Sequence, residues 1–422
     1  MRCILAFLIA LTLCTADESA DRQKEAKSLA RQGSSAIPRL SELIFDEAPA
    51  VRAQAVKSLV SIGGQGSLDP LTRSVADGDP QIQIAAINGL VNFYLPGFVQ
   101  SGVSASLKHT GTKVISKFAG PEEQLIPSFI VPRPEVIGVL AKQIADAKDM
   151  GVRAVAARAA GVLRGRGAVE ALSGALRSKD DALLYESVVA LEKIRDPRGA
   201  PGLVILFRDP KEKIQVAALE AAGLLMNPSL IPDLEKTLLL PKSPKAKRAA
   251  IGALGQLRSE SSRAIFEQHL EDKDDGIRAA ASEALGRLAR PSDSKRIEAL
   301  FKNEGKMEPR LAQAFALVAQ GNHQFEEFSP LRYLTNSLNS KAWGAVAEAY
   351  VTELARQPAV MNAIYSTLPS SPKDEKIRFA RVLSKSGDKS SIEKIEGLTK
   401  DPNTEVAEES VRALRVLKAR LP

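Results

Sequence analysis

The amino-acid sequence predicts an all-α fold, an α-solenoid in which antiparallel helix hairpins stack into a superhelix. Two observations lead to this prediction. An apolar residue, an Ala four residues later and a Leu or Ala four residues further recur with a period of about thirty-one residues. A polar turn and a second apolar segment, often opened by proline, separate successive trios. A unit this short cannot bury its apolar face alone, so neighbouring units must stack into one elongated core.

The apolar trios predict the first helix of each hairpin. A spacing of four residues places all three apolar side chains on one face of a helix, with Lys, Arg, Gln and Glu on the other. We call the first residue of each trio the anchor of its repeat. Anchors stand at Val51, Ile82, Val152, Ile214, Ala246 and Ile277. Each anchor therefore marks the start of an amphipathic helix.

The connectors predict the second helix. Proline suits the opening turn of a helix because the first N–H groups have no intrahelical partner and the ring fixes a helical φ. Turns between units carry Asp, for example Asp46, which can cap the helix that follows. Prolines that open the predicted second helices are Pro38, Pro70, Pro201 and Pro232.

Counting from Asp17, we expect about eleven hairpins and a C-terminal half-unit, in which Val406, Leu414 and Leu417 close the last interface. Because a solenoid grows by adding repeats, residues 17–422 are expected to form a single continuous array. The composition agrees, with 44% hydrophobic residues and only 5% aromatic ones. Small apolar side chains of this kind allow helices to approach closely.

The repeat pattern weakens between residues 305 and 371. The distance from Ile277 to Ile377 is 100 residues, which predicts three slightly long repeats with an anchor at Ile377.

Several units follow the pattern D-x-x-x-V-R-x-x-A-x-x-A-L-G, most clearly residues 46–59 and 274–286. This pattern resembles the HEAT-repeat family, in the short variety shared with phycobilisome bilin lyases. The resemblance covers nearly the whole chain after the N-terminal segment and implies a helical solenoid. It does not imply one activity, since such scaffolds serve unrelated tasks.

The N-terminus is typical of a secretory signal peptide. Arg2 precedes the apolar run of residues 3–13, and small residues end at Ala16, after which we expect cleavage. Lipidation at Cys14 and an uncleaved anchor are the alternatives; the run is too short to span a membrane. The protein is thus predicted to be exported, periplasmic or secreted. Both cysteines lie in residues 1–16, so the mature chain would have no disulfide and no thiolate site.

One repeat carries an insertion. Ile82 and Val152 are 70 residues apart instead of about thirty-one, so residues 93–132 are predicted to be inserted within the third repeat, before a second helix that opens at Pro134. Long insertions emerge on one face of stacked repeats, which is often the binding face. The insertion contains our candidate partner-binding residues Phe93, Tyr94, Phe98, Lys108, Lys113 and Lys117. Three interpretations stay open: packing on its own repeat, recognition of a partner, and membrane contact.

The sequence predicts no catalytic residue, no metal site and no cofactor. Its three histidines are His109, His269 and His323, and none is followed by Glu. Deoxyhypusine hydroxylase, a HEAT-repeat enzyme, depends on His-Glu pairs for its iron, so this activity is not expected here. Lyase activity is not expected either, because no site residue of the bilin lyases can be located in this chain.

The charge is mildly positive, with a formal net charge of +8 over 422 residues. Nucleic-acid binders usually show a denser basic stripe, so no nucleic-acid partner is predicted. Arg52, Arg153 and Arg278 follow the anchors of their repeats, and we expect them to form a ladder of hydrogen bonds and ion pairs between neighbouring turns. The alternative is a charged stripe along one rim of the solenoid.

Together these features predict a non-catalytic protein-interaction scaffold of the cell envelope or extracellular space. The unidentified protein partner would bind the concave solenoid surface and the insertion. The alternatives are an envelope enzyme or lyase-like modifier with a site in the groove, and a membrane-associated or cell-wall-associated module that uses the insertion. The oligomeric state stays open.

Overall fold

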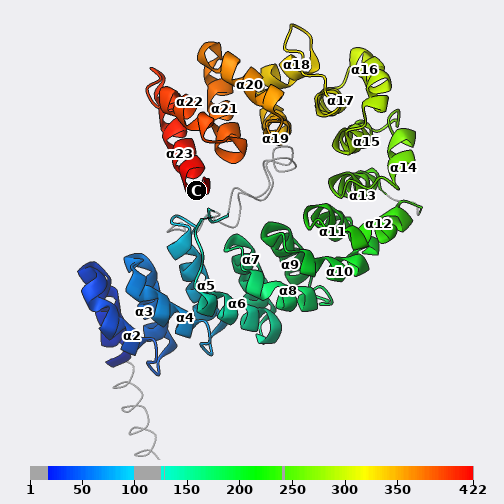
Figure 1. Cartoon of the computed structure of the whole chain (residues 1–422). Coiled ribbons are helices and arrows are strands. Elements are labelled where there is room, and N and C mark those ends of the chain that lie inside the picture. Colours follow the sequence, from blue (N-terminus) through cyan, green and yellow to red (C-terminus); the bar gives the residue numbers. More distant parts are fainter. Residues whose placement is uncertain (1–17, 99–124, 128, 240–242, 422) are drawn as a thin grey trace, which may run out of the picture. The chain divides into compact units, whose positions relative to one another are not determined.

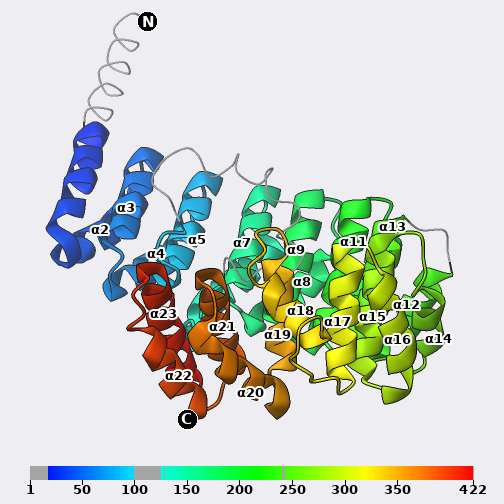
Figure 2. The same cartoon turned by 90° about the horizontal axis from the view of Figure 1, so that it is seen from above.

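The computed structural model describes residues 18–98, 125–127, 129–239 and 243–421. Every regular element in these residues is an α- or 3-10 helix, which confirms the predicted all-α class (Figures 1 and 2). No helix in this part of the chain is long and apolar enough to cross a membrane. The predicted signal peptide, residues 1–16, lies outside the described residues.

The described chain divides into two compact units. The first comprises residues 18–98, 125–127 and 129–203, and the second comprises residues 204–239 and 243–421. The predicted continuity of the array across this boundary stays a prediction.

The first unit begins with a helix over residues 18–29. The helices that follow are α2 (Ile37–Leu43), α3 (Pro49–Ile62), α4 (Leu68–Ser74), α5 (Pro80–Tyr94), α6 (Pro134–Asp146), α7 (Met150–Val162), α8 (Val169–Ala175), α9 (Asp181–Ile194) and α10 (Ala200–Leu203).

The helices of the second unit are α11 (Glu212–Leu224), α12 (Ile231–Leu238), α13 (Pro244–Gln256), α14 (Arg263–Gln268), α15 (Asp275–Leu288), α16 (Ser294–Asn303), α17 (Met307–Ala319), α18 (Pro330–Ser337), α19 (Gly344–Leu354), α20 (Pro358–Thr367), α21 (Lys373–Ser386), α22 (Ser390–Leu398) and α23 (Thr404–Arg420). Within the described residues, the helices of both units form eleven successive pairs followed by α23, as predicted.

The helices of each unit form two layers. Successive odd-numbered helices pack side by side within each unit. The first unit holds the series from α3 to α9, and the second holds the series from α11 to α23. Figure 1 shows that, in the second unit, the odd-numbered helices lie on the inner side of a curve and the even-numbered helices on its outer side.

Glycine brings successive odd-numbered helices into close contact. Gly286 of α15 stands nine residues after the anchor Ile277, and a Cβ atom there would lie 2.7 Å from the Cα atom of Ala316 on α17. Such a short separation is possible only because neither residue has a large side chain. Glycines at the same place in other repeats meet an Ala of the next odd-numbered helix in the same way, namely Gly161, Gly223 and Gly255.

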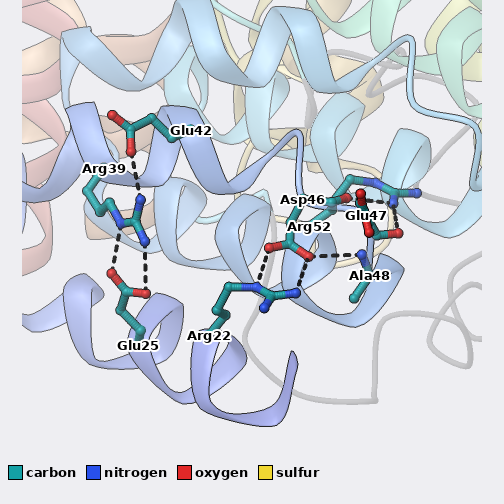
Figure 3. A network of polar contacts seen from close by, with 8 residues as sticks. All are labelled: Arg22, Glu25, Arg39, Glu42, Asp46, Glu47, Ala48 and Arg52. Atoms are coloured by element: carbon teal, nitrogen blue, oxygen red, sulfur yellow. Dashed lines mark hydrogen bonds and ion pairs between the residues drawn. The ribbon is translucent and has the colours of Figure 1, made fainter. Parts of the chain in front are cut away.

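A charged clamp ties the start of an odd-numbered helix to the turn that leads into the next one. Arg52 Nε donates to Asp77 Oδ2 at 2.7 Å, and Asp77 Oδ1 accepts the backbone N–H of Asp79 at 2.8 Å. In every clamp the acid precedes the next anchor by five residues, so the clamps share one register. The others are Arg22–Asp46 (Figure 3), Lys247–Asp272, Arg278–Glu304 and Lys376–Asp401.

Of the predicted arginine ladder, Arg52 and Arg278 form ion pairs with the neighbouring turn, whereas Arg153 forms a hydrogen bond to a backbone carbonyl. Ser178 stands where the other clamps have an acid, and its hydroxyl accepts the backbone N–H of Asp180. With no carboxylate at position 178, Arg153 Nε donates instead to the carbonyl oxygen of Ile144 at 2.7 Å.

The register of α21 also differs from the prediction. Lys376 pairs with Asp401 as Arg52 pairs with Asp77, so the anchor of this repeat is Glu375, not Ile377. Glu375 is 2% exposed, whereas Ile377 is only half-buried. A carboxylate tolerates this buried position because it accepts hydrogen bonds from Asn339 Nδ2 at 3.0 Å and Ser371 Oγ at 3.2 Å.

The predicted closing residues of the C-terminal half-unit differ in their burial. Val406 and Leu417 are fully buried, as expected, while Leu414 is half-buried.

We predict that Gly286→Ala destabilises the second unit by about 1–3 kcal/mol, because the added methyl group must displace the backbone of α17. The matched control is Gly252→Ala in α13, where an added Cβ has no neighbour within 4 Å. That substitution should stabilise by about 0.5–1 kcal/mol, since Ala favours a helix interior. Urea denaturation followed by circular dichroism measures both; equal effects of the two substitutions would contradict the close contact.

We also predict an acid-sensitive contribution from the clamps. The hydrogen bond from Lys376 and the backbone N–H of Asn403 hold the pKa of Asp401 below its usual value. A carboxylate with a depressed folded pKa stabilises the fold above the unfolded pKa, about 3.9, and this contribution disappears as the pH falls through the folded pKa. Denaturation at a series of pH values should thus show stability falling below about pH 4. The fall should be shallower in Asp401→Asn, and an unchanged profile in this variant would refute the role of the clamp.

Candidate partner-binding surface

The kind of residue is constant on the buried face of the odd-numbered helices and varies on their exposed face. The fifth and eighth residues after the anchor are small or apolar in each of α3 to α17 and in α21, and all of them are at most 1% exposed. The sixth residue after the anchor lies on the open side of the helix and changes character from repeat to repeat. We call these residues the open-face row: Lys57, Asn88, Arg158, Val189, Glu220, Gly252, Glu283, Phe315, Arg381 and Arg412.

Most of the open-face row is accessible. Lys57, Arg158, Glu220 and Arg412 are exposed, and only Phe315 is buried. Stacking imposes no common residue type at these positions, so the residue can differ from repeat to repeat. The odd-numbered helices thus combine a uniform buried face with a varied open face.

In the first unit, Arg158 of the open-face row belongs to a partly buried charge pair between α7 and α9. Arg158 Nη2 donates to Glu186 Oε1 at 2.6 Å, and this hydrogen bond raises the pKa of Arg158. Lys193 lies further along α9, and burial lowers the pKa of its ammonium group. Its stem fits beside Gly161, where a Cβ would be 3.4 Å from Lys193 Cδ.

In the second unit, a buried polar cluster joins α15, α17 and α19. Tyr350 Oη donates to Glu283 Oε2 at 2.9 Å, and its ring stacks on Phe315 with centroids 4.7 Å apart. Arg287 pairs with Glu283 and, at 3.1 Å, with Glu353. Burial raises the pKa of Tyr350 well above its usual value, so the hydroxyl stays a donor. Burial opposes the charge of Arg287, but the two carboxylates outweigh it and raise its pKa.

Next to this cluster, cationic side chains of α21 pair with largely buried carboxylates of α19 and α23. Glu348 of α19 accepts hydrogen bonds from Arg378 at 3.0 Å and Lys385 at 3.3 Å, while Arg381 Nε donates to Glu409 of α23 at 2.8 Å. The carboxylate side chains are only 10% and 16% exposed, whereas Lys385 and Arg381 are 46% and 42% exposed. In these pairs the cations are thus more exposed than the carboxylates, while Glu408, 64% exposed, lies 3.7 Å from the neighbouring Arg412. We call Arg381, Lys385 and the neighbouring Arg412 the α21 basic face.

Two hollows open at the turns before the odd-numbered helices. The larger, about 420 Å³, lies at the N-terminal ends of α13, α15 and α17 in the second unit. Its charged lining is balanced, with three cations and three carboxylates: Lys245, Arg248, Lys273, Asp274, Asp275 and Glu308. A hollow of about 340 Å³ in the first unit is lined by residues of the Arg52–Asp77 clamp and by the exposed ring of Phe45.

Two histidines take part in hydrogen bonds of the scaffold. His269 Nδ1 donates to the carbonyl oxygen of Ile265 at 2.7 Å, and His323 Nε2 lies 2.5 Å from Gln357 Oε1. His109 lies outside the described residues. Among the residues that the structure describes, no group of three or more His, Cys, Asp or Glu is placed to hold a metal ion.

The candidate residues of the insertion are placed only in part. Phe93 and Tyr94 belong to α5, so the inserted segment begins after Tyr94 and not at residue 93, while α6 begins at Pro134 as predicted. Phe98 is half-buried, and the predicted contacts Lys108, Lys113 and Lys117 lie outside the described residues.

Tyr94 is engaged within its own repeat. It is 8% exposed, its Oη accepts the backbone N–H of Arg133 at 3.0 Å, and the ring of Phe93 stands edge-on to it at 5.0 Å. For Tyr94 this burial favours packing on its own repeat over contact with a partner. The last part of the insertion is fixed as well, because Ile126 is 1% exposed and its N–H donates to the carbonyl oxygen of Val162 at 3.1 Å.

We predict that Tyr350→Phe lowers the free energy of unfolding by about 1.5–3 kcal/mol, because Glu283 loses a buried hydrogen bond. The control is Tyr333→Phe, whose hydroxyl contacts Met307 Sδ at 3.1 Å on an exposed edge, with an expected change within about 0.5 kcal/mol. Both values come from urea denaturation, and a similar loss in both variants would exclude a special role for the buried cluster.

Comparisons with known proteins agree with this architecture. The family model for HEAT repeats matches residues 6–91, 137–223, 200–286 and 231–317. A deoxyhypusine hydroxylase of Eremothecium gossypii is 28% identical over 115 residues, which make up 26% of this chain. The matched part spans 36% of the length of that curated relative.

Two solved structures are similar at low identity. The complex of CpcE and CpcF of phycocyanin lyase from Nostoc sp. PCC7120 is 18% identical with a TM-score of 0.41, covering 58% of this chain and 93% of that chain. An engineered protein is 18% identical with a TM-score of 0.39, covering 90% of this chain and 98% of that chain. The family model alone covers more than half of the sequence, and the chain therefore belongs to the HEAT-repeat family.

Proposed function

We propose that the protein is a non-catalytic scaffold that binds a protein partner along the open face of its odd-numbered helices. HEAT repeats are typical of protein-interaction scaffolds, and the open-face row carries the proposal for this chain. Its side chains vary between repeats whose buried positions are uniform, as expected where a partner, and not the fold, selects the residue. Binding would use shape and charge complementarity, with no covalent step.

The charges of the second unit favour an acidic partner segment at the α21 basic face. Arg381, Lys385 and Arg412 are held in place by Glu348 and Glu409, so fewer side-chain conformations are lost on binding. Cations at the rim of an interface mainly accelerate association and make it sensitive to salt. The insertion would supply a second contact.

The site of action that we propose is the cell envelope or the extracellular space. Residues 1–16 support it, because a basic residue, a short apolar run and small residues at its end are typical of exported chains.

An enzymatic role is the alternative, and the identity with a deoxyhypusine hydroxylase is the observation in its favour. The match spans only 36% of that relative, and this sequence has no His-Glu pair that could supply the iron ligands expected for such an enzyme. We therefore propose neither hydroxylation nor a lyase-like modification.

Capture of partners from envelope extract tests the proposal. The triple variant Arg381→Glu, Lys385→Glu and Arg412→Glu should lose a partner that the unaltered chain retains, and more so at low salt. The control reverses three exposed cations on even-numbered helices: Lys236→Glu, Arg296→Glu and Lys302→Glu. It matches the change in net charge and should retain the partner. Equal capture by both variants would contradict binding at the α21 basic face.

A third variant separates the insertion from the open face. It replaces residues 99–124 by a short linker and keeps Ile126, which the core of the repeat requires. Loss of the partner in this variant alone would move the contact to the insertion. Binding to lipid vesicles or cell-wall sacculi that disappears with residues 99–124 would favour the membrane or cell-wall alternative.

A further inference from the structure

Arg310 occupies the cation position of a clamp, but its side chain has no acceptor within the described chain. Glu304 precedes Pro309 by five residues, so Pro309 is the anchor of α17 and Arg310 follows it. The other cations at this position have an acceptor, which is a carboxylate in the five clamps and a carbonyl oxygen for Arg153. The guanidinium of Arg310 has neither a hydrogen bond nor an ion pair with any residue that the structure describes. It is thus one half of a clamp.

The other half is missing from the sequence. In the clamp register the acid would come from the turn before α19, residues 338–343, and this turn contains none. The chain carries no Asp or Glu at all between Glu327 and Glu348. The turn instead contains Lys341, which is exposed, and Lys306 is exposed directly before α17. Neither lysine forms an ion pair within the residues described. The turns before α17 and α19 therefore carry cations that lack a carboxylate.

Two aromatic rings hold the guanidinium of Arg310. Its Cζ atom lies 5.1 Å from the ring centroid of Phe301 on α16 and 4.9 Å from that of Tyr333 on α18. The two rings stand edge-on to each other, with centroids 5.5 Å apart. These contacts stabilise the cation through the ring faces and do not use its N–H groups as hydrogen-bond donors. The guanidinium is therefore held in position with its donors unused.

The nitrogen atoms of Arg310 differ in their access to solvent. Nε is enclosed and has no acceptor in the described structure, whereas the two terminal Nη atoms are not enclosed. An enclosed N–H group without an acceptor is uncommon in folded proteins. The terminal N–H groups form a planar fork that matches the two oxygens of a carboxylate. Because the rings already fix this fork, less side-chain freedom is lost when an anion binds.

We propose that Arg310 binds a carboxylate from an acidic segment, rich in Asp or Glu, of another protein. This carboxylate would take the place that the acid of the turn takes in the five clamps, and it would pair with the terminal N–H groups of the guanidinium. Lys306 and Lys341 would attract further acids of the same segment. The site lies at the turns before α17 and α19 and not on the open face, so it is distinct from the α21 basic face.

The methyl group of Met307 provides a local readout in the full chain. Its Sδ atom lies 3.1 Å from Tyr333 Oη, so the methyl group reports on a ring that holds Arg310. The chain has five methionines, so carbon-13 labelling of the methionine methyl groups gives a simple spectrum, in which Met307→Leu identifies the resonance of interest. An amidated hexaglutamate peptide at low ionic strength should shift this resonance to saturation. No saturable shift in the unaltered chain would overturn the proposal.

Two substitutions of matched charge test the role of Arg310. Arg310→Gln should raise the dissociation constant read from Met307 about tenfold or more, because a charge-assisted hydrogen-bonded pair is lost. The control is Arg332→Gln in the same unit. Arg332 also lies over a ring, that of Phe325 at 5.1 Å, but it does not stand in the clamp register. This variant should bind like the unaltered chain, and equal weakening by both substitutions would refute the site.

A third variant, Arg310→Lys, keeps the positive charge but lacks the planar fork. It should weaken binding severalfold, and affinity equal to that of the unaltered chain would reduce the site to general attraction between charges. Circular dichroism melting checks that each variant is folded.

Two further probes define the ligand class. A hexaserine peptide has no side-chain carboxylate and should leave the Met307 resonance unshifted. Inorganic phosphate that acts at a lower concentration than hexaglutamate would overturn the assignment to a carboxylate. Because Met307 does not report on the α21 basic face, failure of this site and failure of the proposed function are distinguishable.

Discussion

Burial of the fifth and eighth side chains after each anchor, between successive odd-numbered helices, is the interaction on which the other features of this structure depend. Each buried Leu, Ile or Val contributes about 1.5–3 kcal/mol relative to an exposed position. In a repeat protein each unit contacts only its neighbours, so every interface must supply its own stabilisation. Gly286 and its equivalents increase this burial, because the helices approach so closely at these positions that a Cβ atom would not fit.

The polar groups fix the position of each helix along its neighbour, which the apolar groups leave undetermined. Burial of small side chains holds two helices together but allows them to slide. The clamps remove this freedom because one carboxylate binds both a cation one residue after an anchor and the backbone of the following turn. A helix anchored on one side in this way has its opposite side free, and the open-face row lies there. Stability and recognition are thus assigned to different faces of the same helix.

Much of this organisation could be predicted from the sequence, since period, helix face and turn chemistry are local properties. The number of hairpins and the start of α6 at Pro134 followed from them. Glu375 was missed because its burial depends on Asn339 and Ser371, which a search for apolar trios does not consider. The partner of Arg153 was missed because Ser178 replaces the acid in a single turn.

The candidate surface was harder to predict than the fold. Tyr94 was selected for its residue type, but the sequence could not show that its hydroxyl accepts the backbone N–H of Arg133, which only the folded repeat brings within reach. The open-face row was overlooked although a position-by-position comparison of the repeats contains the signal. It emerges once burial shows which positions the stacking uses.

The most direct measurement is a substitution scan read out by resistance to proteolysis, in which every residue of α3, α5, α7 and α11 is replaced by several amino acids. We predict that replacements at the fifth and eighth positions, such as Leu59 and Ile87, abolish resistance, while polar replacements of Lys57, Asn88 and Glu220 preserve it. Comparable losses at the open-face positions would contradict the separation of a stacking face from a recognition face.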